Sequence, residues 1–382
     1  MKNKLIYLDY AATTPVDPRV AEKLSQHLTM DGVFANPASR SHMYGWQAEA
    51  AVEHARKQVA SLLNADTREI VWTSGATEAN NLAIKGVAEA RQDRGKHLIT
   101  SHSEHKAVID CFKYLESKGF EVTWLNPDSN GEVVCEAVRA AIREDTILVS
   151  LMHVNNETGA INDVYEIGRI LKQKDIIFHI DAAQSAGKLP IDTKTLDADL
   201  ISTCAHKIYG PKGVGALYVR RRDGFVLPAQ IHGGGHERGM RSGTLPTHQI
   251  VAMGESFEIA QVCMSDEQSA IFKLKQMFLD ELIGQVNFKI NGDVTRSISG
   301  ILNLSFPDKD GQTLLSALPK LAISSGSACT SATMSPSHVL KSMGVGDDCA
   351  LGALRFSFGR FTTEEDVISA ADMLKSVLHR MT

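Results

Sequence analysis

The chain has 382 residues, of which 43% are hydrophobic and 22% charged, and its formal net charge is −5. This composition is typical of a globular protein with ample core, arranged as one large domain and one smaller one. The net negative charge disfavours a nucleic-acid-binding protein, which normally presents a basic face.

The first residues reach Asp9 too early for the apolar core of a signal peptide, and no apolar run has the length of a membrane span. We therefore expect a cytoplasmic protein, or one of an organelle matrix if a presequence has been removed. Six scattered cysteines without a C-x-x-C pair disfavour structural disulfides and a zinc site: Cys111, Cys135, Cys204, Cys263, Cys329 and Cys349.

From residue 46 to residue 260, helical and strand patterns alternate. Such alternation predicts an α/β fold with a mainly parallel sheet between helices, and functional residues at the carboxyl edge of that sheet. We predict helices over 47–63, 77–91, 106–118, 135–142 and 164–172, and strands over 69–73, 97–101, 121–125, 146–152 and 215–220, with two further strands ending at Asp181 and Thr203.

After residue 260 the pattern changes to that of a smaller α+β domain. We predict an amphipathic helix over 267–283 and short strands over 288–291 and 301–306. Thr362 and Glu365 have capping-box spacing at the start of a last helix.

Two loops between these elements have an unusual composition: one contains three consecutive arginines, and the other is rich in glycine. Arg220, Arg221 and Arg222 follow a strand, and we favour a solvated rim over a partner site for them. The segment 231–244 is too rich in glycine for a helix, so His232 and His236 do not gain the shared face that a metal site would need. We interpret this segment as a close-approach loop.

The two strongest candidates for catalytic residues lie at the ends of two predicted strands. Lys207 follows the strand that begins at residue 200, and Asp181 ends the strand before it. A lysine that forms a Schiff base and an acid that pairs with the ring nitrogen are the pair that pyridoxal phosphate requires. A structural or surface lysine is the alternative for Lys207 considered alone.

A possible phosphate site lies at a helix start. The strand 69–73 is followed by Ser74, Gly75, Ala76 and Thr77, whose small side chains leave backbone N–H groups and a hydroxyl available to an anion. Many helices begin in this way, so the pattern alone is weak.

Together these motifs resemble the cysteine desulfurases of the iron–sulfur cluster assembly type, a branch of the fold-type I pyridoxal phosphate enzymes within the class V aminotransferases. The matching stretches are spread in the family's order over nearly the whole chain: residues 7–15, 36–39, 73–78, 104–106, 155–157, 206–213, 232–246 and 324–331.

The resemblance implies a fold and two domains. It implies a large cofactor-binding domain over residues 15–260 with a mainly parallel seven-stranded sheet. It implies a small α+β domain made of residues 1–14 and 261–382, which carries a catalytic-cysteine loop at about 324–335. It also implies a homodimer.

The resemblance also assigns roles around pyridoxal 5'-phosphate. Lys207 would bind the cofactor and move the substrate's α-proton, Asp181 would pair with the ring nitrogen, and His105 would stack on the ring and transfer protons. Metal binding by His102, Glu104 and His105 is the alternative for the segment that contains that histidine. The remaining cofactor contacts would come from Ala76, Thr77, Asn156, Gln184, Cys204, His206 and, across the dimer, Thr244.

Cys204 departs from the family pattern, which has a serine at this position. A thiol is a weaker hydrogen-bond donor than a hydroxyl. Strand alternation points Ser202 to the same side, so either Ser202 substitutes for it or the phosphate depends on Thr77, His206 and Thr244.

Cys329 lies among small polar residues without helix or strand period, which predicts an exposed loop rather than a packed structural cysteine. An exposed cysteine can form a thiolate and act as a nucleophile. By resemblance, Cys329 is the residue that forms the persulfide. The resemblance implies no fixed metal, although Cys329 would transiently ligate a [2Fe-2S] cluster with a scaffold partner.

Arg355 lies on an otherwise apolar strand and needs an anion there. A substrate carboxylate would be a bidentate partner for it, with Asn156 as a second contact, and a structural ion pair is the alternative.

We therefore expect a cysteine desulfurase, a transferase that converts L-cysteine to L-alanine. Its sulfur would pass as a Cys329 persulfide to an iron–sulfur scaffold protein or a tRNA-thiolation relay protein. A selenocysteine lyase-like enzyme, or a sulfur-carrier subunit with lapsed catalysis, is the alternative. The family's scaffold-binding C-terminal tail is not found after the last helix of this sequence, so docking of the scaffold stays open.

Overall fold

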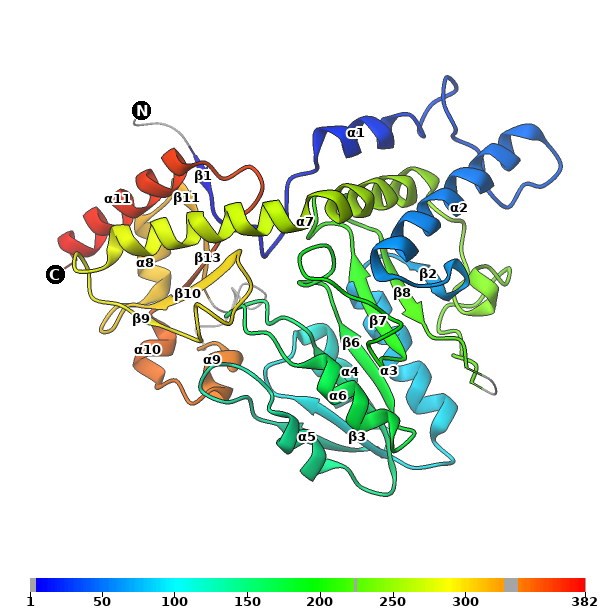
Figure 1. The fold of residues 1–382 in the computed structure, drawn as a ribbon, viewed down its shortest axis with the longest axis horizontal. Helices are drawn as coiled ribbons and strands as arrows, with labels where there is room; N and C mark the ends of the chain where they lie inside the picture. The colour runs from blue at the N-terminus through cyan, green and yellow to red at the C-terminus, as the bar shows by residue number, and fades with distance from the viewer. Residues whose placement is uncertain (1–4, 223–224, 326–335, 382) are drawn as a thin grey trace.

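The computed structural model describes residues 5–222, 225–325 and 336–381. A seven-stranded sheet forms its centre, in the order β2-β8-β7-β6-β5-β3-β4 (Figure 1). Only β8 runs antiparallel to its neighbours in this sheet. The strands are β2 (Ile70–Thr73), β3 (His97–Ser101), β4 (Glu121–Leu125), β5 (Thr146–Met152), β6 (Ile177–Asp181), β7 (Leu200–Cys204) and β8 (Gly215–Val219).

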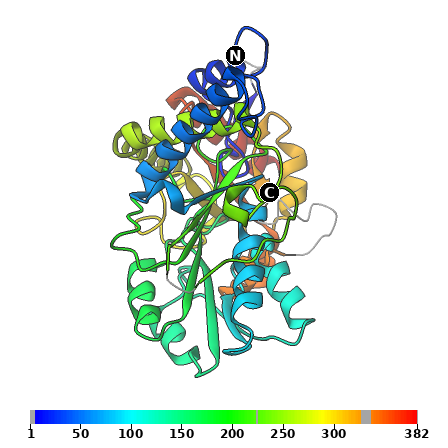
Figure 2. The ribbon, with the colours of Figure 1, turned by 90° about the vertical axis from the view of Figure 1, so that its right-hand side faces the viewer.

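Every residue of the central strands β5, β6 and β7 is buried, so both faces of the sheet need a cover. Helices provide this cover on each face. One apolar core joins the sheet to α2 (Met43–Leu63), α5 (Cys135–Ala141), α6 (Val164–Lys172) and the first half of α7 (Thr247–Leu282). Another joins its opposite face to α3 (Ala76–Arg91) and α4 (Lys106–Glu116), as the turned view makes visible (Figure 2). The mainly parallel α/β fold predicted from the sequence is confirmed.

A smaller antiparallel sheet has the order β12-β13-β10-β9. Its strands are β9 (Lys289–Ile290), β10 (Ile301–Ser305), β12 (Ser324–Ser325) and β13 (Ala353–Ser357). Its core includes α11 (Glu364–Arg380) and the second half of α7. The short helices α8 (Gly311–Ala317), α9 (His338–Ser342) and α10 (Asp347–Leu351) accompany it.

The beginning of the chain joins this smaller part. β1 (Ile6–Tyr7) pairs in parallel with β11 (Leu321–Ala322), and Asp9 forms a bridge with Ser357. Ile6 and Leu8 are buried in the same core as α11. The chain then crosses to the large sheet, where α1 (Pro18–Ser25) packs on α7.

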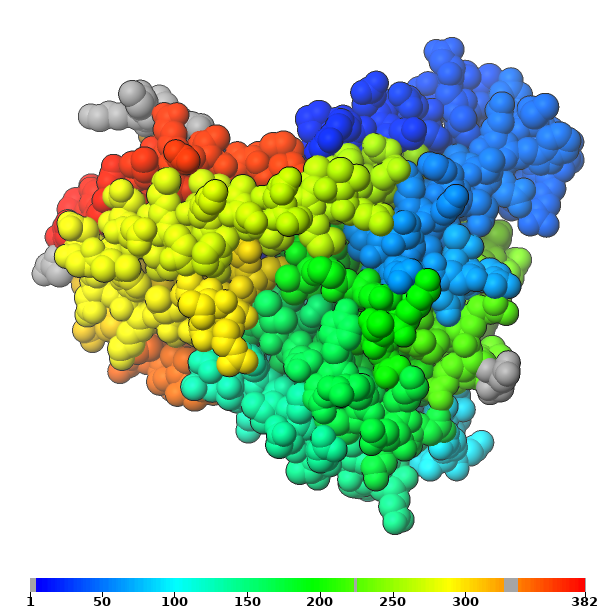
Figure 3. Space-filling model, viewed as in Figure 1, coloured from blue at the N-terminus to red at the C-terminus, as the bar shows by residue number. Residues whose placement is uncertain are grey.

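The helix α7 differs from the prediction, which placed a helix over 267–283 only. A single helix of 36 residues runs from Thr247 to Leu282 and spans the predicted domain boundary at residue 260. It lies along the molecule beside both sheets (Figures 1 and 3). Its first half has its apolar face on the large core and its second half on the small one, so no single periodicity marks the whole helix. The domain boundaries themselves stay a prediction.

Two local predictions need adjustment. The last helix is capped by Thr363 with Asp366 in a capping box, one residue later than the predicted pair.

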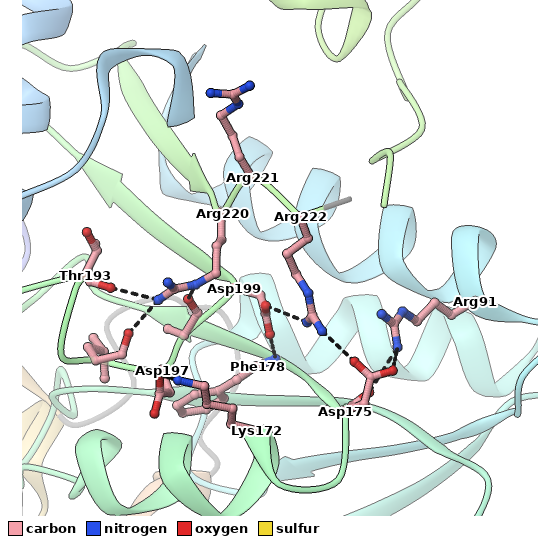
Figure 4. Close-up of polar contacts among 12 residues, drawn as sticks. Arg91, Lys172, Asp175, Phe178, Thr193, Asp197, Asp199, Arg220, Arg221 and Arg222 are labelled. Atoms are coloured by element: carbon pink, nitrogen blue, oxygen red, sulfur yellow. Dashed lines mark hydrogen bonds and ion pairs between the residues drawn. The ribbon is translucent and has the colours of Figure 1, made fainter. Parts of the chain in front are cut away.

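In the arginine cluster only Arg221 extends into solvent (Figure 4). Arg220 donates to the carbonyl groups of Thr193, Leu196 and Ala198, and Arg222 pairs with Asp175 and Asp199, so these two arginines hold the edge of the sheet together.

The described residues contain no helix that is both long enough and apolar enough to cross a membrane.

Candidate active site

A cavity of about 580 Å³ lies at the carboxyl ends of β5, β6 and β7, where it also meets the start of α3. This volume is within the range of small-molecule sites. We call it the main cavity. Ten of the residues predicted from the sequence line it: Ala76, Thr77, His105, Asn156, Asp181, Gln184, Cys204, His206, Lys207 and Arg355.

Asp181 ends β6 and is almost fully buried. Its two carboxylate oxygens accept hydrogen bonds at 2.7 Å from Asn80 Nδ2 and at 2.9 Å from the backbone N–H of Ala183. A buried carboxylate held by two donors has a fixed direction. Asp181 can therefore present its carboxylate in a fixed orientation to a cationic ring nitrogen in the main cavity.

Lys207 follows β7 in a turn, and its Nζ donates to the carbonyl groups of Ala11 at 2.5 Å and Ala12 at 2.6 Å. The beginning of the chain thus supplies acceptors for the amine beside the main cavity. Its neighbour His206 contacts Thr13 Oγ1 at 3.2 Å, and burial, assisted by Lys207, lowers the pKa of His206 to about 4. The imidazole of His206 is therefore neutral at pH 7.

His105 occupies the N-cap position of α4, where its Nδ1 accepts a hydrogen bond at 3.1 Å from the backbone N–H of Ala107. Because Nδ1 accepts, the neutral ring carries its proton on Nε2. Burial lowers the pKa of His105, and nearby Lys207 lowers it further, whereas Asp181 acts in the opposite direction. A neutral imidazole of known tautomer lies beside the lysine and the carboxylate.

The start of α3 provides the features of an anion site. Gly75 is its N-cap residue, with φ 153° and ψ 178°, and no side chain caps the helix. This conformation is open essentially to glycine alone. The first N–H groups of a helix need acceptors, and the positive end of the helix dipole favours an anion there. Thr77 and Ser74 line the main cavity at the same place.

Glycine also lets this turn pack closely. A Cβ atom at Gly215 of β8 would lie 2.7 Å from the Cα of Gly75, which is too close for any other residue. The backbone of the helix start is thus held against the sheet, and Glu78 accepts from the backbone N–H of Ser74 while it pairs with Arg241 at 2.8 Å.

Cys204 is buried in the wall of the main cavity, and burial raises the pKa of its thiol to about 11. Ser202 does not substitute for it. The Ser202 hydroxyl contacts His179 Nε2 at 2.9 Å, while Ser150 contacts the other ring nitrogen of His179 at 2.7 Å. This buried network occupies Ser202, which does not line the main cavity.

Arg355 combines the two alternatives considered for it. On β13 it pairs with Asp9 at 2.8 Å and donates to the carbonyl group of Asn156 at 2.9 Å and to Ser324 Oγ at 3.1 Å. It also lines the main cavity, and its buried Nε has no hydrogen-bond partner among the described residues. A structural ion pair thus holds the Arg355 guanidinium at the wall of the main cavity.

Two predicted residues lie elsewhere. Thr244 is exposed and does not line the main cavity of its own chain. The loop before it is attached to α2 by a buried pair, Arg56 with Glu237, and Glu237 also accepts from the backbone N–H of Trp72 in β2. Cys329 lies outside the described residues, although Ser324 and Ser325 before it form β12 next to Arg355.

Sequence reasoning missed several residues of the main cavity: Asn80, Glu157, Lys212 and His338. Asn80 lies on α3 one turn after Thr77, a spacing that could have placed it on the same face. Glu157 is fully buried, and burial raises its pKa to about 7 while Ser337, 2.5 Å away, and Arg355 lower it. No local pattern marks a buried acid of this kind.

Comparison with known proteins agrees with this geometry. The family described as aminotransferase class-V matches residues 6–369. Cysteine desulfurase IscS from Shewanella sp. (strain ANA-3) is 59% identical over 376 residues, which cover 98% of this chain and 93% of that protein. Cysteine desulfurase IscS from Vibrio vulnificus (strain CMCP6) is 57% identical with the same coverage.

Solved structures show the same fold. A NifS-like protein is 37% identical with a TM-score of 0.91, over 98% of this chain and all of the other. SspA in complex with cysteine is 39% identical with a TM-score of 0.83, over 94% of this chain and all of the other. From the family match and from relatives of this identity and coverage, the chain belongs to the class-V aminotransferase family and, within it, to the cysteine desulfurases.

Proposed function

We propose that this enzyme binds pyridoxal 5'-phosphate in the main cavity, where it converts L-cysteine to L-alanine and retains the sulfur as a persulfide of Cys329. The observation that carries the proposal is the convergence of Lys207, Asp181, His105 and Arg355 on one cavity from four different elements. Their chemistry is complementary to a phosphorylated, cationic aromatic aldehyde and to an amino acid carboxylate.

The residues of the cavity fit this cofactor. The uncapped helix start at Gly75 and Thr77 suits the phosphate, and the fixed carboxylate of Asp181 suits the ring nitrogen. Lys207 supplies the amine that binds the aldehyde. When bound, pyridoxal phosphate would supply an electron sink for bonds broken at the substrate's α-carbon.

The side chains of the main cavity and Cys329 would then have separate roles in binding, proton transfer and sulfur transfer. Arg355, which lines the main cavity, binds the substrate carboxylate, with Asn156 beside it. Lys207, once released, removes the α-proton, and His105 Nε2 is the second group that can hold or return a proton. The Cys329 thiolate attacks the substrate sulfur, so that a sulfur–sulfur bond forms as the carbon–sulfur bond breaks. The carbon product leaves as alanine after protonation.

The quaternary structure and the partners are part of the proposal. Apolar side chains are exposed between α1 and α2 and in the first turn of α2 (Met30, Met43, Tyr44 and Trp46). This part of the chain projects from the rest of the molecule (Figure 3). Together with the position of Thr244 outside its own main cavity, these side chains support a homodimer in which Thr244 reaches the phosphate of the partner subunit. We propose an iron–sulfur scaffold protein or a tRNA-thiolation relay protein as the sulfur acceptor. The five described cysteines are free thiols, which supports a cytoplasmic location.

Lys207→Ala tests the proposal. The variant should fold as the wild type does and should lose alanine formation from L-cysteine, together with the visible absorption that the wild-type protein shows with its cofactor. Alanine formation by Lys207→Ala at the wild-type rate would contradict the proposal.

A further inference from the structure

A second lysine lies directly beside the proposed active site. Lys188 Nζ donates at 3.1 Å to the amide oxygen of Gln184, which lines the main cavity. A second cavity of about 20 Å³ has Lys188, Lys207 and Ala11 in its wall. Lys207 and Ala11 thus line both cavities, whereas Lys188 lines only the second one.

The contact with Lys188 decides how the amide of Gln184 is turned. An ammonium can only donate, so it requires the amide oxygen on its own side. The amide nitrogen of Gln184 then donates to the carbonyl group of Ala11 at 2.8 Å, the same carbonyl that accepts from Lys207. The second N–H of this amide has no acceptor among the described residues, so the side chain offers the main cavity a donor.

Lys188 also brings charge to this place. Burial lowers the pKa of Lys188 to about 8, and Lys207 lowers it further. Two neighbouring ammonium groups each disfavour the protonation of the other. Three other titratable or charged groups face Lys188, one each from β7, α7 and β13: Cys204, Glu267 and Arg355. Two tyrosines, Tyr10 and Tyr209, also line the second cavity.

We propose that Lys188 is a positioning residue of the active site, which turns the Gln184 amide so that its N–H faces the cofactor and places a positive charge behind Lys207. The inference rests on the proposed function, because the group that would accept from Gln184 is an anionic oxygen of the bound cofactor ring. A phenolic oxygen of pyridoxal phosphate has this chemistry. Lys188 would not itself touch the substrate.

Three substitutions separate the two effects. Lys188→Met removes both the donor and the charge. Lys188→Gln keeps an N–H donor for Gln184 but no charge, whereas Lys188→Arg keeps both. Lys275→Met is the matched control, because Lys275 is a buried lysine of α7 that donates to Val294, Ser297 and Ile298, away from the main cavity.

Two readouts other than turnover test the proposal. The first is the affinity of each apoprotein for pyridoxal phosphate, measured by equilibrium dialysis, with circular dichroism as the check of folding. The second is the pH midpoint of the visible absorption of each cofactor-loaded protein. Lys188→Met should weaken cofactor binding about three- to tenfold, as the loss of one hydrogen bond does. It should also raise the pH midpoint by about half a unit, because the neighbouring positive charge is gone.

The variants should then differ in a set order. Lys188→Gln should recover most of the affinity but keep the raised midpoint, and Lys188→Arg should restore the wild-type midpoint. The proposal is overturned if Lys188→Met has the affinity and midpoint of the wild type, or if Lys275→Met changes both equally. A wild-type protein that binds no pyridoxal phosphate would overturn the proposed function itself, and this inference with it.

Discussion

The buried ion pair that attaches the glycine-rich loop to α2 gives the sharpest stability prediction. Arg56 of α2 and Glu237 of the loop form a bidentate pair, with distances of 2.7 and 2.9 Å, and their side chains are 4% and 3% exposed. Glu237 also accepts at 2.8 Å from the backbone N–H of Trp72 in β2. Replacement of Glu237 by leucine therefore leaves three buried N–H donors, two of Arg56 and one of Trp72, without this acceptor.

The expected cost follows from this burial. Removal of one partner from a buried pair destabilises a protein by about 3–5 kcal/mol, because the other charge stays buried alone. Replacement of both partners by apolar residues costs far less. We expect Glu237→Leu and Arg56→Met each to lose about 3–5 kcal/mol, and the double variant to lose less than either single variant.

Urea unfolding of the full chain at one fixed protein concentration measures these values. Glu53→Ala is the matched control: Glu53 also contacts Arg56, at 3.0 Å, but its side chain is 56% exposed, so we expect a change of about 1 kcal/mol or less. A loss below about 1 kcal/mol in Glu237→Leu, or a double variant as unstable as the sum of the two single variants, would refute the reasoning.

Three further predictions concern the main cavity. Cys204→Ser restores a stronger donor in the buried wall and should tighten pyridoxal phosphate binding by up to about tenfold, measured on the apoprotein; unchanged or weaker binding would contradict a role of this position in cofactor binding. Gly75→Ala should cost about 1–3 kcal/mol in urea unfolding, because its φ of 153° is strained for any side chain; a neutral substitution would contradict the required conformation. Glu157 has its pKa raised to about 7 in the fold, above the 4.5 of an exposed glutamate, so the folded state binds more protons and wild-type stability falls as the pH rises from about 4.5 to 7. Glu157→Gln should flatten this slope, and a variant with the wild-type slope would contradict it.

Sequence patterns predicted those parts of the fold that depend on local periodicity. The strands 97–101, 121–125 and 146–152 and the helix 164–172 agree with the structure residue for residue, because each has one dominant apolar face or a continuous buried run. The helix α7 does not, since its two halves bury different faces in two cores. The strands β11 and β12 are each only two residues long, which is too short to show a hydrophobic pattern. They form because they pair with strands far away in the sequence.

In the candidate site, the residues at strand ends and helix starts could be predicted from the sequence. The residues that form hydrogen bonds with them could not. Asp181 and Lys207 follow apolar strands, and topology alone brings such positions to one edge. Asn80, which orients Asp181, and Ala11, which accepts from Lys207, lie 101 and 196 residues away from those partners. Side-chain alternation could place Ser202 on the same side of β7 as Cys204, but it could not show that His179 of the neighbouring strand contacts the Ser202 hydroxyl.

The most direct test of the whole account is the release of alanine and sulfide from L-cysteine in the presence of a thiol reductant, measured for the wild type and for Cys329→Ser. Wild-type protein should release both products. Cys329→Ser should keep the visible absorption of the bound cofactor but release no sulfide. Equal sulfide release by the two proteins would contradict the assignment of Cys329 as the sulfur acceptor and would favour a lyase that needs no such cysteine.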